Sequence, residues 1–159
     1  VHPFEGKELS EDKPIKYLEP LQGEVMVYPL SQHIGAPAKP LVAKGDHVLK
    51  GQIIAEAGGF ISANVLSSVS GTVKGIESKL VANGAMVQSI LVENDGEEEA
   101  IEGFGTDRDA SKLSKEEIRQ IVKDAGIVGL GGAGFPTHVK LTPKDENAID
   151  YVIVNGAEC

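Results

Sequence analysis

The sequence predicts an α+β protein in two parts, a small all-β domain followed by the start of an α/β domain. Three observations support this fold class. Short β-type apolar runs separated by turn residues fill positions 23–95. A capped helical repeat occupies positions 114–125, and a glycine-rich loop with a later apolar run follows it. Strand signals that come first and helix signals that come later are typical of α+β organisation.

Residues 1–22 precede the first strand signal. They contain three prolines and many charged side chains. Proline fixes one backbone dihedral and removes a hydrogen-bond donor, so it disfavours regular structure. We therefore expect an extended N-terminal arm that packs on one of the domains.

Residues 23–95 form the predicted all-β domain. Its β-type runs are Glu24–Tyr28, Ile53–Ala55, Gly71–Ile76 and Ser89–Val92. Turn residues punctuate them at Lys44–Asp46, Lys50–Gly51, Gly58–Gly59 and Asn83–Gly84. Short strands at this spacing indicate a small sandwich or barrel.

Residues 96–110 are predicted to be an acidic linker. The segment 93–109 is dense in charge and poor in large apolar side chains, a composition that cannot build a core. We assign it no binding partner.

Residues 111–159 are predicted to be the N-terminal portion of an α/β nucleotide-binding domain. Ser114 and Glu117 have capping-box spacing, apolar residues recur at helical spacing through 118–125, and Gly126 sits where a helix would end. The run Tyr151–Val154, bounded by Asp150 and Asn155, is typical of a buried strand.

The glycine loop, defined as residues 129–134, has four glycines in six positions. Such a loop can bring bare N–H groups to a phosphate, and Pro136 suits the first turn of a following helix. The loop satisfies the G-x-G-x-x-G pattern, but the preceding segment is helical where a dinucleotide fingerprint needs a strand. A conventional Rossmann turn and a loop that serves only helix packing both remain open.

Composition limits the possible partners. The formal net charge is −9, from 15 basic and 24 acidic residues, which disfavours nucleic acid or an anionic membrane as the main partner. No uninterrupted apolar stretch of about 18 residues is present, so we expect no membrane span. The single cysteine, Cys159, excludes an internal disulfide and fits a reducing compartment. The chain begins without Met and stops abruptly, so we expect a fragment.

The glycine loop continues as Phe135-Pro-Thr with Lys140 after it, and Asn155–Cys159 closes the apolar run. This pattern resembles the flavin- and NADH-binding subunit of respiratory complex I. It is more similar to the C subunit of the Rnf (Rsx) ion-translocating ferredoxin:NAD oxidoreductases. The opening Val1–Lys7 and the segment Pro29–Lys39 resemble that C subunit too, so the likeness covers nearly the whole chain.

The β-domain carries a second resemblance. The phrases Val42–Ala55 and Ser67–Val73 are similar to the half-repeats of biotinyl and lipoyl domains, which implies a barrel-sandwich hybrid. A swinging-arm carrier is therefore an alternative function. Carriers need a modified lysine on the hairpin between the halves, and Ala57–Ala63 offers none. We interpret the domain as a carrier-like fold used for assembly.

The resemblance to the flavin subunits implies roles for individual residues. The backbone of the glycine loop would surround FMN and NAD(H), Phe135 would form an apolar wall, and Lys140 would face a phosphate. Asn155 would hydrogen-bond the flavin edge, with Glu158 on the nicotinamide side. The cofactor-binding set is thus Gly129, Gly131, Gly132, Ala133, Gly134, Phe135, Lys140, Asn155 and Glu158.

Two differences from complex I limit this assignment. Leu130 stands where an arginine is common, and Asn155–Cys159 replaces a longer acidic run. The Rnf C subunits carry two 4Fe-4S clusters on cysteine-rich motifs late in their sequences. This chain has no C-x-x-C motif, so the cluster ligands are expected outside it.

The resemblance predicts a subunit that passes electrons between NADH and ferredoxin. Its partners would be the other subunits of the membrane complex, with ferredoxin as redox partner, and it would lie in the cytoplasm on the inner face of the cell membrane. The alternative is a non-catalytic quinone-site or assembly subunit like the A subunit of the sodium-pumping NADH:quinone oxidoreductase.

Three single residues receive simple interpretations. His33 is predicted to be a hydrogen-bonded loop histidine, since no partner stands at metal-ligand spacing. His138 would contact a phosphate or lie on a helix surface. Cys159 is interpreted as a buried thiol, because no base is adjacent in sequence.

Overall fold

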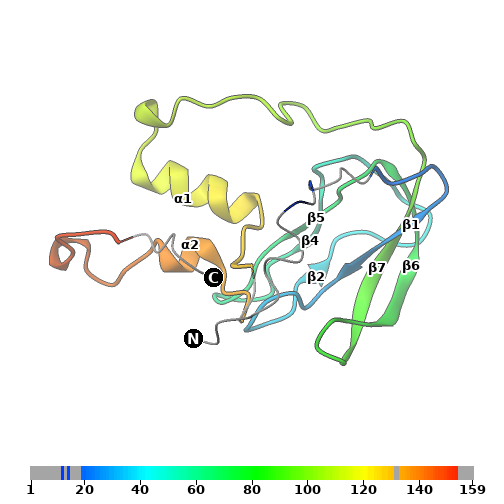
Figure 1. Ribbon diagram of the computed structural model, residues 1–159, viewed down its shortest axis with the longest axis horizontal. Helices are drawn as coiled ribbons and strands as arrows, with labels where there is room; N and C mark the ends of the chain where they lie inside the picture. Colours follow the sequence, from blue (N-terminus) through cyan, green and yellow to red (C-terminus); the bar gives the residue numbers. More distant parts are fainter. Residues whose placement is uncertain (1–11, 13, 15–18, 131–132, 154–159) are drawn as a thin grey trace.

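The computed structural model describes residues 12, 14, 19–130 and 133–153 (Figure 1). Its β-part consists of two antiparallel sheets, one with the strand order β1-β7-β6-β3 and the other with the order β2-β4-β5. We call this part the barrel. The strands are β1 (Val25–Pro29), β2 (Lys39–Pro40), β3 (His47–Val48), β4 (Ile53–Glu56), β5 (Val65–Leu66), β6 (Gly71–Leu80) and β7 (Met86–Asn94).

Glycines make the turns that the sequence predicted. Gly45 and Gly51 adopt positive φ angles of 97° and 84° between short strands. Gly84, with φ of 82°, turns the long hairpin from β6 to β7, in which Leu80 pairs with Met86 at the tip. Residues with a Cβ atom adopt these dihedrals at a steric cost.

The core lies between the two sheets. Its most deeply buried side chains are Val48, Ile54, Val73, Ile90 and Val92, all with exposed fractions of 0 or 1%. Ile90 and Val92 are two residues apart on β7, so the alternation of a strand sends both to the same face. The predicted all-β sandwich or barrel is confirmed.

The segment after β7 crosses to the helices along one side of the barrel (Figure 1). Residues 96–110 are all exposed. The segment is nevertheless attached to the barrel, because Lys50 N–H donates to Glu99 O at 2.9 Å and Ile101 N–H donates to Lys50 O at 3.0 Å. A Cβ atom on Gly51 would lie 2.5 Å from the Phe104 ring, so only glycine permits that ring to approach.

Helix α1 (Lys115–Asp124) begins and ends where the sequence predicted. The Ser114 hydroxyl accepts from Glu117 N–H at 3.2 Å, and the Glu117 carboxylate accepts from Ser114 N–H at 2.7 Å. This reciprocal pair is the predicted capping box. Ala125 ends the helix, and Gly126 follows it with φ of 62°. Helix α2 (Thr137–Lys140) is one turn long, and the described residues also form the 3₁₀ turns η2 (Ala110–Lys112) and η3 (Glu146–Ala148).

The predicted buried strand at Tyr151–Val154 is wrong for the residues that are described. Tyr151, Val152 and Ile153 are 85%, 86% and 90% exposed and belong to no strand. A strand needs a neighbouring strand to satisfy its backbone groups, and the described residues place none beside this run. Apolar composition alone does not bury it.

Replacing Ile54 with Ala tests the barrel core. Ile54 is fully buried, so Ile54→Ala should lower the free energy of unfolding by about 2–5 kcal/mol through lost apolar contact and the cavity left behind. Urea denaturation measures this change. Leu80→Ala is the matched control, because Leu80 is 71% exposed and its truncation should cost less than about 0.5 kcal/mol. Equal costs for the two variants would contradict the assigned core.

Candidate functional site

Two short segments, residues 127–129 and 135–137, pair with each other at the base of the glycine loop. We call this pair of segments the neck. Gly129 N–H donates to Phe135 O at 3.0 Å, and Thr137 N–H donates to Ile127 O at 2.9 Å. Between these bonds Val128 and Pro136 form an antiparallel bridge. The predicted order of helix, loop and helix is confirmed, and it differs from the strand-to-helix turn of a Rossmann fingerprint.

Pro136 occupies a different position from the predicted one. It is the N-cap residue of α2, with φ of −58° and extended ψ, and the helix starts only at Thr137. Proline was expected inside the first turn. The bridge with Val128 explains the shift, because it keeps Pro136 in the extended neck.

The neck brings three of the predicted site residues together. The Lys140 ammonium lies 3.3 Å from the position that a Cβ atom of Gly129 would take. The same position is 3.6 Å from the Phe135 amide nitrogen. Among the described residues, no carboxylate forms an ion pair with Lys140. Gly131, Gly132, Asn155 and Glu158 lie outside the described residues.

Three consecutive amides follow the undescribed part of the loop. Within the described residues, the N–H groups of Ala133, Gly134 and Phe135 donate no hydrogen bond, whereas those of Gly129 and Thr137 are used in the neck. The Phe135 amide and the Lys140 ammonium both lie next to Gly129, and amide donors combined with a positive charge are groups that bind phosphate oxygens. The residues present therefore suit an anionic ligand group.

The loop also rests on the barrel, a contact that sequence reasoning missed. Ile34 N–H donates to Ala133 O at 2.9 Å. Gly134 has φ of 59°, and a Cβ atom on it would lie 2.8 Å from Gln32 O. The glycines of the loop predicted that another group would approach its backbone closely. Only the fold identifies the barrel loop at 31–37 as the partner.

His33 lies in that barrel loop, and the prediction of a hydrogen-bonded loop histidine is confirmed. Its Nδ1 is 3.0 Å from Ile34 O, and its Nε2 is 3.1 Å from Ala63 N. A cavity of about 290 Å³ separates this region from the neck, with Gln32, His33 and Val128 in its walls. The histidine is thus close to the loop while it contacts other backbone groups.

His138 is partly enclosed on α2. Its Nδ1 atom is buried and has no hydrogen-bond partner among the described residues. Burial lowers the pKa of His138 below its usual value, the positive charge of Lys123 lowers it further, and a hydrogen bond with the Phe60 backbone opposes both. The neutral imidazole is favoured, so His138 supplies no positive charge to a phosphate in this state.

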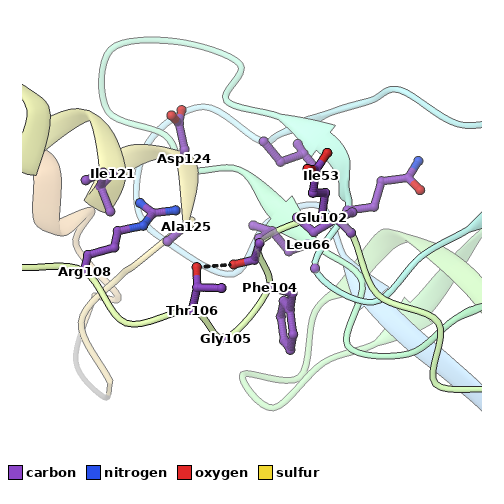
Figure 2. A pocket seen from close by; sticks show the side chains of 14 residues that line it. Ile53, Leu66, Glu102, Phe104, Gly105, Thr106, Arg108, Ile121, Asp124 and Ala125 are labelled. Carbon is purple, nitrogen blue, oxygen red and sulfur yellow. Dashed lines mark hydrogen bonds between the residues drawn. The ribbon is translucent and has the colours of Figure 1, made fainter.

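A larger groove lies away from the glycine loop. It has a volume of about 590 Å³ and runs between β4, β5, the segment 101–108 and the end of α1. Figure 2 shows Ile53 and Leu66 of the barrel on one side and Ile121 and Ala125 of α1 on the other. None of its described lining residues belongs to the predicted site. Among the described residues, the groove and the candidate nucleotide site therefore share no side chain.

Within the described part of the chain, no group of three or more His, Cys, Asp or Glu side chains is arranged to hold a metal ion. None of the helices described is long and apolar enough to cross a membrane.

Comparison with known families divides the chain in two. Residues 1–97 match the family described as the RnfC barrel sandwich hybrid domain. Residues 122–159, which contain the glycine loop, match the Nuo51 FMN-binding domain. The predicted barrel-sandwich hybrid is confirmed by the first match.

Curated relatives are similar along the whole chain. It is 45% identical over 159 residues to the C subunit of the proton-translocating ferredoxin:NAD(+) oxidoreductase complex of Clostridium ljungdahlii, covering all of this chain and 34% of the relative. It is 42% identical to the Na(+)-translocating counterpart of Acetobacterium woodii, covering 35% of that protein. It is 39% identical to the C subunit of the ion-translocating oxidoreductase complex of Rhodobacter capsulatus, covering 30%. The chain spans about a third of the length of these relatives.

The lowered pKa of His138 predicts a pH dependence of stability. The unfolded chain takes up a proton at this residue as the pH falls below about 6.5, before the folded chain does. Stability should therefore decrease from that pH downward until the folded imidazole is also protonated. His138→Gln should flatten this part of the profile, measured by urea denaturation between about pH 7 and 5.

Lys123→Gln is the matched variant, because it removes only the second cause of the shift. It should reduce the pH dependence without abolishing it. The pKa values of the Glu117 and Glu146 carboxyl groups are lowered, so their contribution to stability is lost mainly as the pH falls through the ordinary value of about 4.5, below this window. An unchanged profile in His138→Gln would contradict the assignment.

Proposed function

This chain belongs to the RnfC family, and on that premise we propose that it forms part of the NADH and FMN site of an ion-translocating ferredoxin:NAD oxidoreductase complex. One observation supports this most directly: the match to an FMN-binding domain covers residues 122–159, where the glycine loop lies. The relatives that are similar along the whole of this chain are named as C subunits of such complexes.

The described part of the loop and Phe135 after it are suited to the phosphate of a nucleotide. The amides of Ala133, Gly134 and Phe135 are the donors that would bind phosphate oxygens, and the Lys140 ammonium adds a positive charge beside them. Gly129 acts differently, because its N–H already donates to Phe135 O. It contributes a backbone without side-chain cover, which a flat ring system can approach closely.

The remaining assignments rest on sequence similarity. Gly131 and Gly132 would complete the loop around FMN and the dinucleotide. Asn155 would hydrogen-bond the flavin edge, and Glu158 would lie on the nicotinamide side. Phe135, which is partly buried, would form an apolar wall. The bound flavin supplies the exchange of electrons with NADH, and these residues bind and orient the two cofactors.

The complete protein would act within a larger assembly. We propose that ferredoxin is the redox partner of the complex and that iron-sulfur clusters, held by parts of the subunit outside this chain, connect ferredoxin to the flavin. The subunit would lie peripherally on the inner face of the cell membrane, in contact with membrane-embedded subunits. The names of the relatives, which describe ion-translocating complexes, support this arrangement.

Flavin binding by the full-length protein tests the proposal. The purified protein should bind FMN, and NADH should bleach the flavin absorption under anaerobic conditions. Gly129→Val should abolish both, because the added side chain covers the backbone that the cofactor approaches. The protein should stay folded, because the new Cβ atom would lie 3.3 Å from the flexible Lys140 end and 3.6 and 3.7 Å from the Phe135 backbone nitrogen and oxygen, which are ordinary contact distances. Gly129→Ala should have a smaller effect. If the full-length protein does not bind FMN or react with NADH, and a quinone analogue stabilises it against unfolding, the result would support the quinone-site alternative.

Removal of the Lys140 charge tests the phosphate contact separately. Lys140→Met keeps most of the side-chain volume and should weaken nucleotide binding about 10- to 100-fold, the usual cost of losing one hydrogen bond to a charged group. Isothermal titration of the full-length protein at two salt concentrations measures it. Wild-type binding should weaken with added salt more than binding by Lys140→Met does, because only the wild type makes the ion pair. Lys44→Met, in an exposed turn of the barrel, is the matched control.

A further inference from the structure

Three segments meet where the barrel touches the glycine loop. The barrel loop 31–37 lies between the hairpin 57–63 on one side and residues 133–134 on the other. Ala36 N–H donates to Ile61 O at 3.0 Å, which joins the barrel loop to the hairpin. Ile34 N–H donates to Ala133 O at 2.9 Å, which joins it to the glycine loop. The barrel loop is therefore hydrogen-bonded to the hairpin at one end and to the candidate site at the other.

His33 fixes the barrel loop to the hairpin. Ala63 N–H can only donate, so the Nε2 atom of His33 at 3.1 Å must accept. The Nδ1 atom then carries the proton and donates to Ile34 O at 3.0 Å. Ala63 is 1% exposed, so its N–H has no access to water and needs this acceptor. The neutral imidazole of His33 thus contacts both Ala63 of the hairpin and Ile34, and the N–H of Ile34 donates to the glycine loop.

The junction has no room for side chains between its backbones. A Cβ atom on Gly35 would lie 2.1 Å from Ile61 O, and one on Gly58 would lie 2.0 Å from Pro37 O. Ser62 is fully buried in the same place, where its hydroxyl donates to Ala36 O at 2.8 Å and accepts from Gly58 N–H at 2.9 Å. Contacts made directly between backbones leave little freedom for adjustment.

We propose that His33 is a positioning residue of the nucleotide site. By tying the barrel loop to the hairpin, it holds the Ile34 amide against the Ala133 carbonyl, and it thereby orients the amides of Ala133, Gly134 and Phe135 toward the phosphate of the ligand. The inference rests on the proposed function. It also gives the hairpin, where carrier domains bear their lysine, a role in building the site.

Two substitutions of His33 in the full-length protein test the inference. His33→Leu removes the acceptor and leaves Ala63 N–H buried without a partner, so FMN or NADH binding should weaken on the order of tenfold. Amide hydrogen exchange at Ile34 should become faster, because its bond to Ala133 O loosens. His33→Gln presents an acceptor oxygen at a similar reach and should restore both binding and protection.

His47→Leu is the matched control. His47 lies on β3, hydrogen-bonds Asp95 at 2.9 Å and is half exposed. Its replacement should leave cofactor binding and Ile34 exchange at wild-type values. A thermal denaturation series on all variants separates a local effect from general destabilisation.

The outcomes distinguish this inference from the proposed function. If the wild type binds cofactor and His33→Leu binds equally well with unchanged Ile34 exchange, the positioning role is wrong and the function stands. The role is also wrong if His33→Gln fails to restore binding although it restores thermal stability. If the wild type binds neither FMN nor NADH, the proposed function fails and the positioning role with it, even where His33→Leu speeds Ile34 exchange.

Discussion

Direct backbone contact between the barrel and the glycine loop is the constraint on which the candidate site depends. At Gly134 the loop backbone approaches Gln32 O so closely that a Cβ atom would lie 2.8 Å from it. At Gly126, just before the neck, a Cβ atom would lie 2.4 Å from Asn64 O. Both glycines also adopt positive φ, which residues with a Cβ atom rarely do. Glycine at these two positions therefore lets the backbone pack directly against the barrel on either side of the neck.

The helices that flank the loop are too weakly anchored to position it. No residue of α1 or α2 is buried, and α2 has only one turn. Isolated helices of this length are marginal in water, since most helical stability comes from tertiary packing. The barrel, with its closed apolar core around Ile54 and Ile90, provides the rigid support. Binding groups on loops commonly depend on a scaffold of this kind.

The barrel uses a carrier-like hairpin for a different purpose. In carriers the hairpin must project freely so that its modified lysine can move. Here the segment 57–63 has no lysine, and its backbone is bound to the barrel loop through Ile61 and through the buried Ser62 hydroxyl. The same supersecondary element can be a mobile arm or a fixed support, and the difference lies in whether its tip carries an amine or packs against a neighbour.

The local features of this chain were determined by its sequence alone. The capping box at Ser114 and the end of α1 just before Gly126 follow from hydrogen bonds within a few residues. The positions of the main barrel strands follow from side-chain alternation and turn residues, although their pairing joins distant segments. The resemblance of the glycine loop to a flavin site is likewise a matter of consecutive residues. The apolar run at 151–153 shows where such reasoning stops, because a strand forms only when a second strand pairs with it.

Only the tertiary structure decided which distant groups meet. Ile34 and Ala133 are about a hundred positions apart, as are Gln32 and Gly134, and no local pattern connects them. The role of His33 between Ala63 and Ile34 is of the same kind. Such contacts depend on how whole elements pack. A buried backbone group needs a hydrogen-bond partner, but that partner can come from any part of the chain. The sequence determined that a glycine-rich loop would exist, and packing against the barrel decided where its residues 133 and 134 lie.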